Sequence, residues 1–349
     1  EDVISLGVGE PDFVTPWTIR ESCVYGLEQG YTSYTANRGM LELRQEIARL
    51  QKDRYSLDYD SATDVLVTVG VSEALDLAMR AVLSPGDEIL IPEPCYVSYK
   101  ACAALAGGIG VPVPAKIENE FRITPKDLAA HLTPRTKALL IGYPNNPTGA
   151  VMGKDDLSAI AQFAEEHDLI VISDEIYGDL TYSGETHIAF PSLPGMKART
   201  ILLNGFSKAY AMTGWRVGWL IGPEDVVKAA SNLQSHLTSN VNNIAQRAAL
   251  EALTGSQNDV EEMHAAFNRR RTKIVDGLNA IDGVHCPSPK GAFYAYPDVR
   301  GLLGKEIAGK HPQTSAELAE LILEEAEVAV VPGEAFGPSG YLRLSYALS

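Results

Sequence analysis

The middle of this 349-residue chain alternates short apolar runs with helical stretches, and this alternation restricts the fold more than any other feature. The apolar runs are Val65–Val69, Glu88–Ile91, Ala138–Ile141, Leu169–Ser173, Ile201–Leu203 and Val217–Ile221. Helical stretches separate several of these runs, at Ser72–Leu83, Tyr96–Ala106 and Lys154–His167. Continuously apolar strands with helices between them predict an α/β fold with a mostly parallel sheet covered on both faces. Ligands bind at the carboxyl ends of such strands, so the residues after each run are the candidates for a site.

The segments on either side of this middle part have different patterns. Helices are predicted at Arg20–Gln29, Leu41–Lys52, much of Val226–Thr254 and Asp259–Ala280, and a polar loop at Gly30–Gly39. After Gly291, short strand signals surround a helix near Ser315–Glu325, which is typical of a smaller α+β unit. We therefore predict an N-terminal segment over 1–30 that joins the small domain, a large domain over 31–255 and a small domain over 256–349. We interpret the basic cluster Arg269–Arg271 as a solvated helix face.

Composition excludes several classes of function. The formal net charge of −16 argues against nucleic acid or an anionic membrane as a partner. No apolar run reaches the roughly 18 residues of a membrane span, and no signal peptide opens the sequence. The four cysteines, Cys23, Cys95, Cys102 and Cys286, form no metal-ligand pattern with the seven histidines and are typical of reduced thiols. We expect a cytoplasmic protein without a metal.

A lysine and an arginine follow the fifth apolar run, in the sequence NGFSKAYAMTGWRVG. Lys208 lies just past the run, and a lysine is seldom buried without a partner or a function. A lysine with a lowered pKa is the nucleophile that forms a Schiff base with an aldehyde. Arg216 would then supply a fixed cation for a phosphate. An aldehyde and a phosphate on one ligand indicate pyridoxal 5'-phosphate (PLP).

Polar residues after the other strands supply the remaining groups that this cofactor needs. Gly70–Glu73 can start a helix whose free N–H groups bind phosphate, with Ser72 as its cap. Tyr96 can stack on a heteroaromatic ring, and Asn146 can donate its amide to a phenolate oxygen. Asp174, at the end of a buried strand, needs a cation such as a protonated pyridine nitrogen. Tyr177 is near enough in sequence to reach the same ring. Each feature alone has a structural explanation, but together they favour a PLP site.

The whole chain also resembles the class I/II aminotransferases of PLP fold type I. The motifs that carry the resemblance are SLGVGEPDF, YTSYTANRG, YPNNPTG, SDEIY, FSKAYAMTGWRVG, GAFYAYP, VVPGEAFG and RLSYA, in this order. The subgroup that it is most similar to contains bacterial aspartate, aromatic and N-acetyl-diaminopimelate aminotransferases.

The resemblance implies a role for each matching residue. Lys208 would form the Schiff base and then move the proton between substrate and cofactor, while Asp174 keeps the pyridine nitrogen protonated. Tyr96 would stack on the ring, and Tyr177 and Asn146 would hold its phenolic oxygen. The residues implied at the phosphate are Val71, Ser72, Ser207, Arg216 and, from the neighbouring subunit of a homodimer, Tyr34. Those implied at the substrate carboxylate are Arg343, Asn146 and the backbone at Gly9.

The sequence departs from the family pattern at three places. Position 205 is glycine where many relatives have a phosphate-binding serine, so Ser207 or the backbone must serve instead. The chain ends at Ser349, directly after RLSYA, and the loop at Gly340–Tyr341 is about two residues short. We expect segments to be missing from the sequence at both of these places.

Two alternative functions fit the same motifs in part. A C–S β-lyase of this fold starts with the same linkage and proton removal, and a PLP-sensing transcription regulator uses the fold as an effector domain. The regulator needs a DNA-binding segment before Ile4, and the acidic chain does not favour it. Phe13, Val14, Thr15, Trp17 and Tyr31 are candidate residues of the substrate side-chain pocket. This mixture is compatible with aromatic, acidic or N-acylated side chains, and we predict a broad amino acid:2-oxoglutarate transferase.

Overall fold

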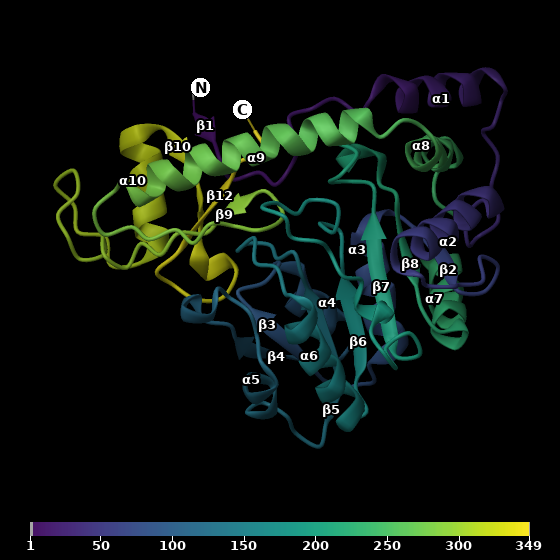
Figure 1. The fold of residues 1–349 in the computed structure, drawn as a ribbon, viewed down its shortest axis with the longest axis horizontal. Helices are drawn as coiled ribbons and strands as arrows, with labels where there is room; N and C mark the ends of the chain where they lie inside the picture. The colour runs from purple at the N-terminus through teal and green to yellow at the C-terminus, as the bar shows by residue number, and fades with distance from the viewer. Residues whose placement is uncertain (1–2, 349) are drawn as a thin grey trace.

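The alternation of apolar runs and helices produces a seven-stranded sheet in the computed structural model, which describes residues 3–348 (Figure 1). The strands lie in the order β2-β8-β7-β6-β5-β3-β4. Their bounds are β2 (Val65–Thr68), β3 (Glu88–Glu93), β4 (Ile109–Pro114), β5 (Thr136–Gly142), β6 (Ile170–Asp174), β7 (Thr200–Gly205) and β8 (Gly218–Ile221). Strands β4, β3, β5, β6 and β7 run parallel, and β8 is antiparallel to both of its neighbours. The predicted mostly parallel α/β sheet is confirmed.

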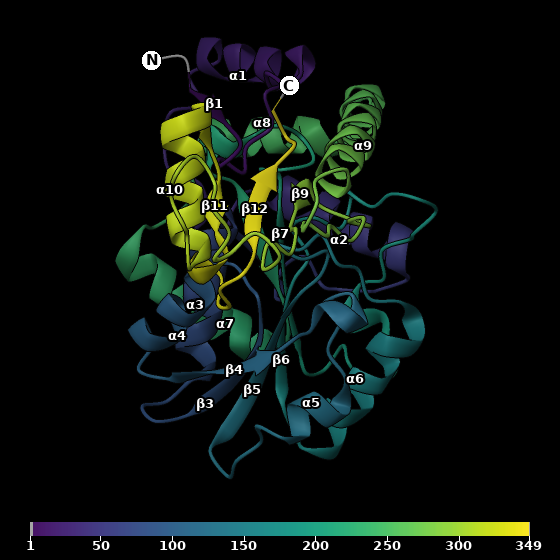
Figure 2. The same ribbon diagram turned by 90° about the vertical axis from the view of Figure 1, so that its left-hand side faces the viewer.

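Helices cover both faces of this sheet because successive side chains of each strand point to opposite sides (Figure 2). In β5, Ala138 and Leu140 pack in one core cluster, and Leu139 and Ile141 pack in another. The first face carries α3 (Gly70–Val82), α4 (Ser98–Leu105) and α7 (Glu224–Leu237). The second face carries α2 (Leu41–Tyr55), α5 (Pro125–Ala129), α6 (Lys154–Glu166) and α8 (Asn243–Thr254).

The edge strand β4 is absent from the sequence prediction. Its residues Ile109–Pro114 pair in parallel with β3 along the whole strand. Two prolines and a glycine interrupt its apolar character, and only Val113 is buried. Proline is tolerated at a sheet edge, where its missing N–H faces no partner strand. The strand therefore lacks the continuous apolar run by which the inner strands can be recognised.

The second lobe combines the C-terminal part of the chain with its N-terminal segment (Figure 1). Strand β1 (Ile4–Ser5) pairs in parallel with β10 (Val328–Ala329). Strands β9 (Tyr294–Ala295), β12 (Leu342–Ser345) and β11 (Val331–Pro332) form an antiparallel sheet. The predicted domain boundaries at residues 30 and 255 stay a prediction. Residues 1–2 and 349, at the two ends of the predicted domains, lie outside the described residues.

The remaining helices lie outside the two layers that cover the seven-stranded sheet. They are α1 (Trp17–Glu28), α9 (Asn258–Asn279), α10 (Ser315–Ala326) and the short 3-10 helices η1 (Ile117–Asn119), η2 (Phe190–Ser192), η3 (Thr213–Trp215) and η4 (Gly333–Ala335). Helix α9 runs across the top of the molecule, from α8 toward the second lobe (Figure 1). Among residues 3–348, no helix has the length and apolarity that crossing a membrane requires.

The basic cluster of α9 is not the solvated face that the sequence predicted. Arg269 is exposed, but Arg270 forms a two-pronged ion pair with Asp12 at 3.0 and 3.1 Å. The guanidinium of Arg270 also donates to the carbonyl of Ala347 at 2.8 Å and lies 5.3 Å from the centre of the Phe13 ring. Arg270 therefore ties the N-terminal segment to α9. The sequence missed this role because its partners are more than 70 residues away in the chain.

Replacing Arg270 with alanine should lower the free energy of unfolding by about 1–2 kcal/mol, because a two-pronged, partly buried ion pair and its ring contact are lost. The neighbouring Arg269→Ala is the matched control and should change stability by less than about 0.5 kcal/mol. Urea unfolding of both variants would measure the difference. Equal effects of the two substitutions would contradict the anchoring role of Arg270.

Candidate active site

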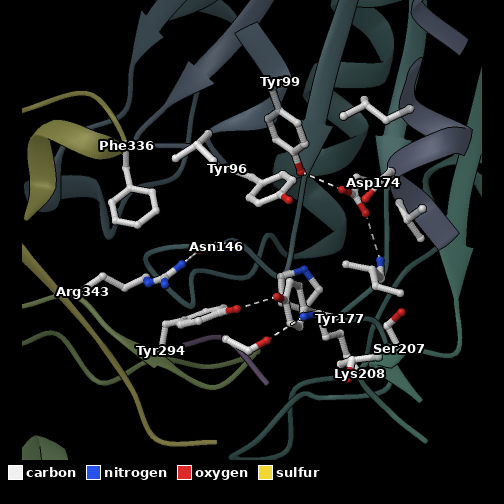
Figure 3. A pocket seen from close by; sticks show the side chains of 18 of the residues that line it. Tyr96, Tyr99, Asn146, Asp174, Tyr177, Ser207, Lys208, Tyr294, Phe336 and Arg343 are labelled. Atoms are coloured by element: carbon white, nitrogen blue, oxygen red, sulfur yellow. Dashed lines mark hydrogen bonds between the residues drawn. The ribbon is translucent and has the colours of Figure 1, made fainter. Parts of the chain in front are cut away.

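A cavity of about 510 Å³ lies where the carboxyl ends of the parallel strands face the second lobe (Figure 3). It collects every residue that was predicted to bind the cofactor or the substrate carboxylate, except Tyr34. The candidates for the substrate side-chain pocket do not line it: Phe13, Val14, Thr15, Trp17 and Tyr31. The predicted residues that line it are Gly9, Val71, Ser72, Tyr96, Asn146, Asp174, Tyr177, Ser207, Lys208, Arg216 and Arg343. They come from the ends of β3, β5, β6 and β7, the start of α3, the turn before β8, the N-terminal segment and β12. The strand-end rule thus located the cavity, while the roles of the residues stay predictions.

The carboxylate of Asp174 is buried at the end of β6, on the wall of the cavity. It accepts a hydrogen bond from the Tyr99 hydroxyl at 2.9 Å and one from the backbone N–H of Ile176 at 3.2 Å. Burial raises the pKa of Asp174 to about 6, although both hydrogen bonds act in the opposite direction. A cation in the cavity would favour the ionised form of this carboxylate.

Tyr99 was missed by the sequence analysis, although it contacts Asp174 directly. It lies in the first turn of α4, three residues after Tyr96, and the two rings meet edge to face with their centres 5.7 Å apart. Its hydroxyl can reach Asp174 because residue 142 is glycine: a Cβ there would lie 2.4 Å from the hydroxyl oxygen. The tyrosine three residues after Tyr96 was a usable signal, because this spacing would put both rings on one face of the predicted helix over Tyr96–Ala106. In the structure α4 begins at Ser98, so Tyr96 lies just before the helix.

Lys208 follows β7 and points into the cavity, where its Nζ donates to the carbonyl of Gly9 at 2.7 Å (Figure 3). Burial lowers the pKa of Lys208 to about 8. The nearby cations Arg216 and Arg343 act in the same direction, whereas Glu10 and Asp174 oppose it. A lysine with this pKa carries a substantial neutral fraction near neutral pH, which is the nucleophilic form.

Arg343 enters the cavity from β12 in the second lobe. Its guanidinium donates to the side-chain oxygen of Asn146 at 3.0 Å and to the carbonyl of Gly7 at 2.6 Å. The ring of Phe336 lies 4.8 Å from the guanidinium carbon. The Nε atom of Arg343 is buried and has no hydrogen-bond partner among the described residues. A guanidinium in this arrangement can bind a carboxylate through two parallel hydrogen bonds.

Asn146 can face Arg343 because its neighbour Asn145 builds the loop after β5. Asn145 donates to the carbonyl of Gly142 at 3.2 Å and accepts from the backbone and hydroxyl of Thr148 at 3.1 and 2.7 Å. The two consecutive asparagines therefore have separate functions. One shapes the loop and the other points into the cavity (Figure 3).

Tyr177 shares a hydrogen bond with Tyr294, their hydroxyl oxygens being 2.7 Å apart. Tyr294 belongs to β9, so this contact joins the two lobes across the cavity. Tyr294 belongs to the GAFYAYP motif, but no role was predicted for it from the sequence. Gly9 makes room for this hydroxyl, since a Cβ at residue 9 would lie 2.1 Å from its oxygen.

The start of α3 and Arg216 form one corner of the cavity. Helix α3 begins at Gly70, whose φ of 70° suits glycine, and a Cβ at that position would lie 2.5 Å from the Arg216 guanidinium. Ser72 lies inside the first turn, so the prediction that it caps the helix is wrong. Instead, the carboxylate of Glu73 accepts a hydrogen bond from the N–H of Val69, the residue before the helix, at 2.6 Å. The positive helix end and the guanidinium together can bind an anion.

Gly205 leaves no room for a side chain. A Cβ there would lie 2.9 Å from the Cα of Gly218 on β8. Ser207, which the sequence analysis named as a substitute, is buried and lines the cavity.

A second buried carboxylate, Glu175, lies directly after Asp174 and was not predicted. Its carboxylate accepts hydrogen bonds from Ser173 Oγ at 2.9 Å and from the N–H of Phe190 at 2.8 Å, and it pairs with the His187 ring at 2.6 Å. These contacts anchor the chain between Asp174 and Tyr177. Successive side chains of an extended segment point to opposite faces of the sheet, so the carboxylates of Asp174 and Glu175 lie on opposite sides of it.

Tyr34 does not line the cavity and is 90% exposed. Its predicted contact with the phosphate of a neighbouring subunit is a contact between chains, so it stays a prediction.

Comparisons with known proteins identify relatives over the full length of the chain. The family model described as aminotransferase class I and II matches residues 1–349. A putative aminotransferase of Bacillus subtilis, YugH, is 49% identical over all of this chain and 88% of its own length. An aspartate aminotransferase of Streptomyces avermitilis is 51% identical over 99% of this chain and 85% of its own length.

Solved structures of aminotransferases share this fold. The aromatic aminotransferase of Pyrococcus horikoshii has a TM-score of 0.95 and 44% identity, covering all of this chain and 92% of its own. The aspartate aminotransferase of Rhizobium meliloti has a TM-score of 0.96 and 40% identity, over 99% of this chain and 87% of its own.

The raised pKa of Asp174 predicts that the stability of the cofactor-free protein falls as pH rises from about 4 to 6. In this window the unfolded chain has lost the proton, because its carboxyl has an ordinary pKa near 4, while the native carboxyl retains it. Relative to Asp174→Asn, wild-type protein should lose about 3 kcal/mol of unfolding free energy across the window. Urea unfolding at several pH values would measure this difference.

Tyr99→Phe serves as a check on that assignment. It removes a hydrogen bond that favours the charged carboxylate, so the pKa of Asp174 should rise further and the loss of stability should extend above pH 6. A window that moves to lower pH would contradict the assignment.

Proposed function

We propose how this chain, which belongs to the class I and II aminotransferase family, carries out its amino-group transfer. As a family member it is a PLP-dependent transferase that exchanges an amino group between an amino acid and a 2-oxo acid. We assign the cofactor to the cavity between the lobes. The observation that carries this assignment is that a half-buried lysine with a lowered pKa, a buried carboxylate and two arginines line one cavity.

The residues of the cavity fit the chemistry of PLP. When bound, PLP supplies an aldehyde that links to amines and a ring that accepts electrons. Lys208 would bind the aldehyde carbon, and Asp174 would hold a proton on the ring nitrogen. The corner formed by Val71, Ser72 and Arg216, with Ser207, would bind the phosphate. Tyr96 would stack on the ring, and Tyr177 and Asn146 would donate hydrogen bonds to its phenolic oxygen.

Lys208 would also act as the acid and base that moves the proton of the reaction. Because its pKa is lowered, Nζ can be neutral and would take the proton from the substrate Cα. The ammonium form would then give the proton back to complete the transfer. Tyr99 supports this step from a distance, because it favours the charged form of Asp174. Closure of the cavity by the second lobe would exclude water from the proton transfer.

Arg343 would bind the substrate α-carboxylate. Its guanidinium contacts the Gly7 carbonyl and the Asn146 side-chain oxygen, and both contacts can give way to a carboxylate. The nearby backbone at Gly9 would complete the carboxylate site. This site would admit both amino acids and 2-oxo acids, since both carry the same carboxylate.

The active unit would be a homodimer in which Tyr34 reaches the partner's phosphate site. Large apolar side chains are exposed on and around α1, as expected of a surface that a second copy covers. The exposed set comprises Val14, Trp17, Val24, Tyr25, Leu27, Tyr34, Leu41 and Leu237.

For the substrate, we propose a broad amino donor range with 2-oxoglutarate as acceptor. The relatives are named as aspartate, aromatic and aspartate/prephenate aminotransferases. These names do not favour the C–S β-lyase alternative. N-acetyl-diaminopimelate stays a candidate donor because the sequence resembles that subgroup.

A spectral titration tests this function. Addition of glutamate, aspartate, an aromatic amino acid or N-acetyl-diaminopimelate should bleach the visible absorption of the bound cofactor, and a 2-oxo acid should restore it. The donor with the fastest change identifies the preferred substrate. Accumulation of pyruvate from a sulfur amino acid, without reversible bleaching, would support the lyase instead.

Arg343→Lys should separate binding from chemistry. A lysine cannot make two parallel hydrogen bonds to a carboxylate, so kcat/KM should fall about 100-fold or more for all donors. The visible absorption of the bound cofactor should persist, because Arg343 is not assigned to PLP. Arg300→Lys, on the exposed surface, is the control and should leave kcat/KM unchanged. An unchanged kcat/KM in Arg343→Lys would exclude the assigned carboxylate site.

A further inference from the structure

Two fully buried glutamines support the loop that carries Tyr34. We call residues 31–39 the interface loop, because its tip is the exposed Tyr34 side chain. Gln234 of α7 and Gln246 of α8 both have 0% exposure. A buried amide is costly unless all of its hydrogen bonds are made, so the partners of these side chains define what each amide holds in place.

Gln246 forms hydrogen bonds at both ends of the segment from Thr35 to Met40. Its side-chain oxygen accepts from the N–H of Met40 at 2.7 Å, and its amide nitrogen donates to Thr35 Oγ1 at 3.0 Å. The same nitrogen donates to the carbonyl of Val241 at 2.8 Å. These partners lie in the loop, directly after it and shortly before α8, so Gln246 has no described hydrogen bond to a residue that lines the cavity.

Gln234 differs from Gln246 because it connects the loop to β2 and to Glu73 in the first turn of α3. Its side-chain oxygen accepts from Asn37 Nδ2 at 3.3 Å. Its amide nitrogen donates to the carbonyl of Val67 at 2.8 Å and to the carboxylate of Glu73 at 3.2 Å. A carbonyl and a carboxylate can only accept, so the amide has a single satisfied orientation. The side chain therefore connects Asn37 of the loop to Glu73 through hydrogen bonds.

Glu73 in turn sets the position of the α3 start. The carboxylate oxygen that accepts from Gln234 also accepts from the N–H of Val69 at 2.6 Å, and the other oxygen accepts from Thr238. Val69 directly precedes Gly70, against which the Arg216 guanidinium packs. A shift of Glu73 would therefore move the helix end at which the phosphate is expected.

We propose that Gln234 is a positioning residue that couples subunit association to phosphate binding. When a second subunit fixes the interface loop, Asn37 orders the Gln234 amide, and Glu73 then holds the α3 start in its binding position. Linkage requires the reverse effect of equal size, so bound PLP strengthens association by the factor by which association strengthens PLP binding. This coupling rests on the proposed homodimer and PLP site, and it acts in addition to any direct contact of Tyr34.

The test compares the dimer dissociation constant of cofactor-free and PLP-loaded protein by sedimentation. In the wild type we expect PLP to tighten association by about 10-fold, within the usual range for coupled sites. Asn37→Ala breaks the connection at the loop and should reduce this factor to below about 3-fold. Gln234→Glu replaces the donor amide with a carboxylate that faces Glu73, and it should have the same effect.

Two further variants distinguish the relay through Gln234 from a general loosening of the interface loop and from a direct effect of Tyr34. Thr35→Val removes the contact of Gln246 with the same loop and should keep the 10-fold factor, so an equal loss there would overturn the proposal. Tyr34→Phe removes the hydroxyl that would reach the partner's phosphate site. Asn37→Ala must still reduce the coupling in this background; if its effect disappears, the coupling runs through Tyr34 alone and the proposal is wrong.

The same measurements separate this proposal from the proposed function. A wild-type protein that binds PLP as a monomer would refute the homodimer, and a wild-type dimer that fails to bind PLP would refute the cofactor site. A wild-type dimer with coupling that Asn37→Ala and Gln234→Glu leave unchanged, both being folded by circular dichroism, refutes the relay only.

Discussion

The burial of Asp174 at a strand end is the constraint on which the rest of the cavity depends. A carboxylate in this position needs hydrogen bonds and a nearby cation, and the structure supplies Tyr99 and the N–H of Ile176. Gly142 has no side chain and so lets Tyr99 approach. The segment that follows the strand is held in place by Glu175, which pairs with His187. Much of the local sequence is therefore explained by the requirements of one buried carboxyl group.

The two lobes are joined through the cavity itself and not only by the chain connections. The carbonyls of Gly7 and Gly9 accept hydrogen bonds from Arg343 and Lys208, so the N-terminal segment contacts both cations. Arg270 fixes the same segment to α9 through Asp12. Occupancy of the cavity and the placement of the N-terminal segment should therefore depend on each other.

The sequence was most informative where one residue has to satisfy a strong local requirement. Apolar runs marked the inner strands, and polar residues after them marked the cavity wall, because the carboxyl ends of parallel strands meet at one edge. The residues that it missed obtain their roles from distant partners. Tyr294 meets Tyr177 across 117 positions of sequence, and Arg270 meets Asp12 across 258. The edge strand β4 was missed because its prolines and glycine hide the apolar pattern, and Ser72 was misread because Glu73 makes the hydrogen bond that precedes α3.

The antiparallel direction of β8 has a consequence for how this scaffold can change. Since β8 returns beside β7, with Gly205 opposite Gly218, Lys208 and Arg216 lie on one short connection at the same edge of the sheet. A parallel β8 would need a long crossover and would begin at the opposite edge. The spacing between Lys208 and Arg216 is thus fixed by this one connection. Changes in the N-terminal segment or the second lobe can therefore alter the rest of the cavity wall while Lys208 and Arg216, the two proposed attachment points of the cofactor, keep their separation.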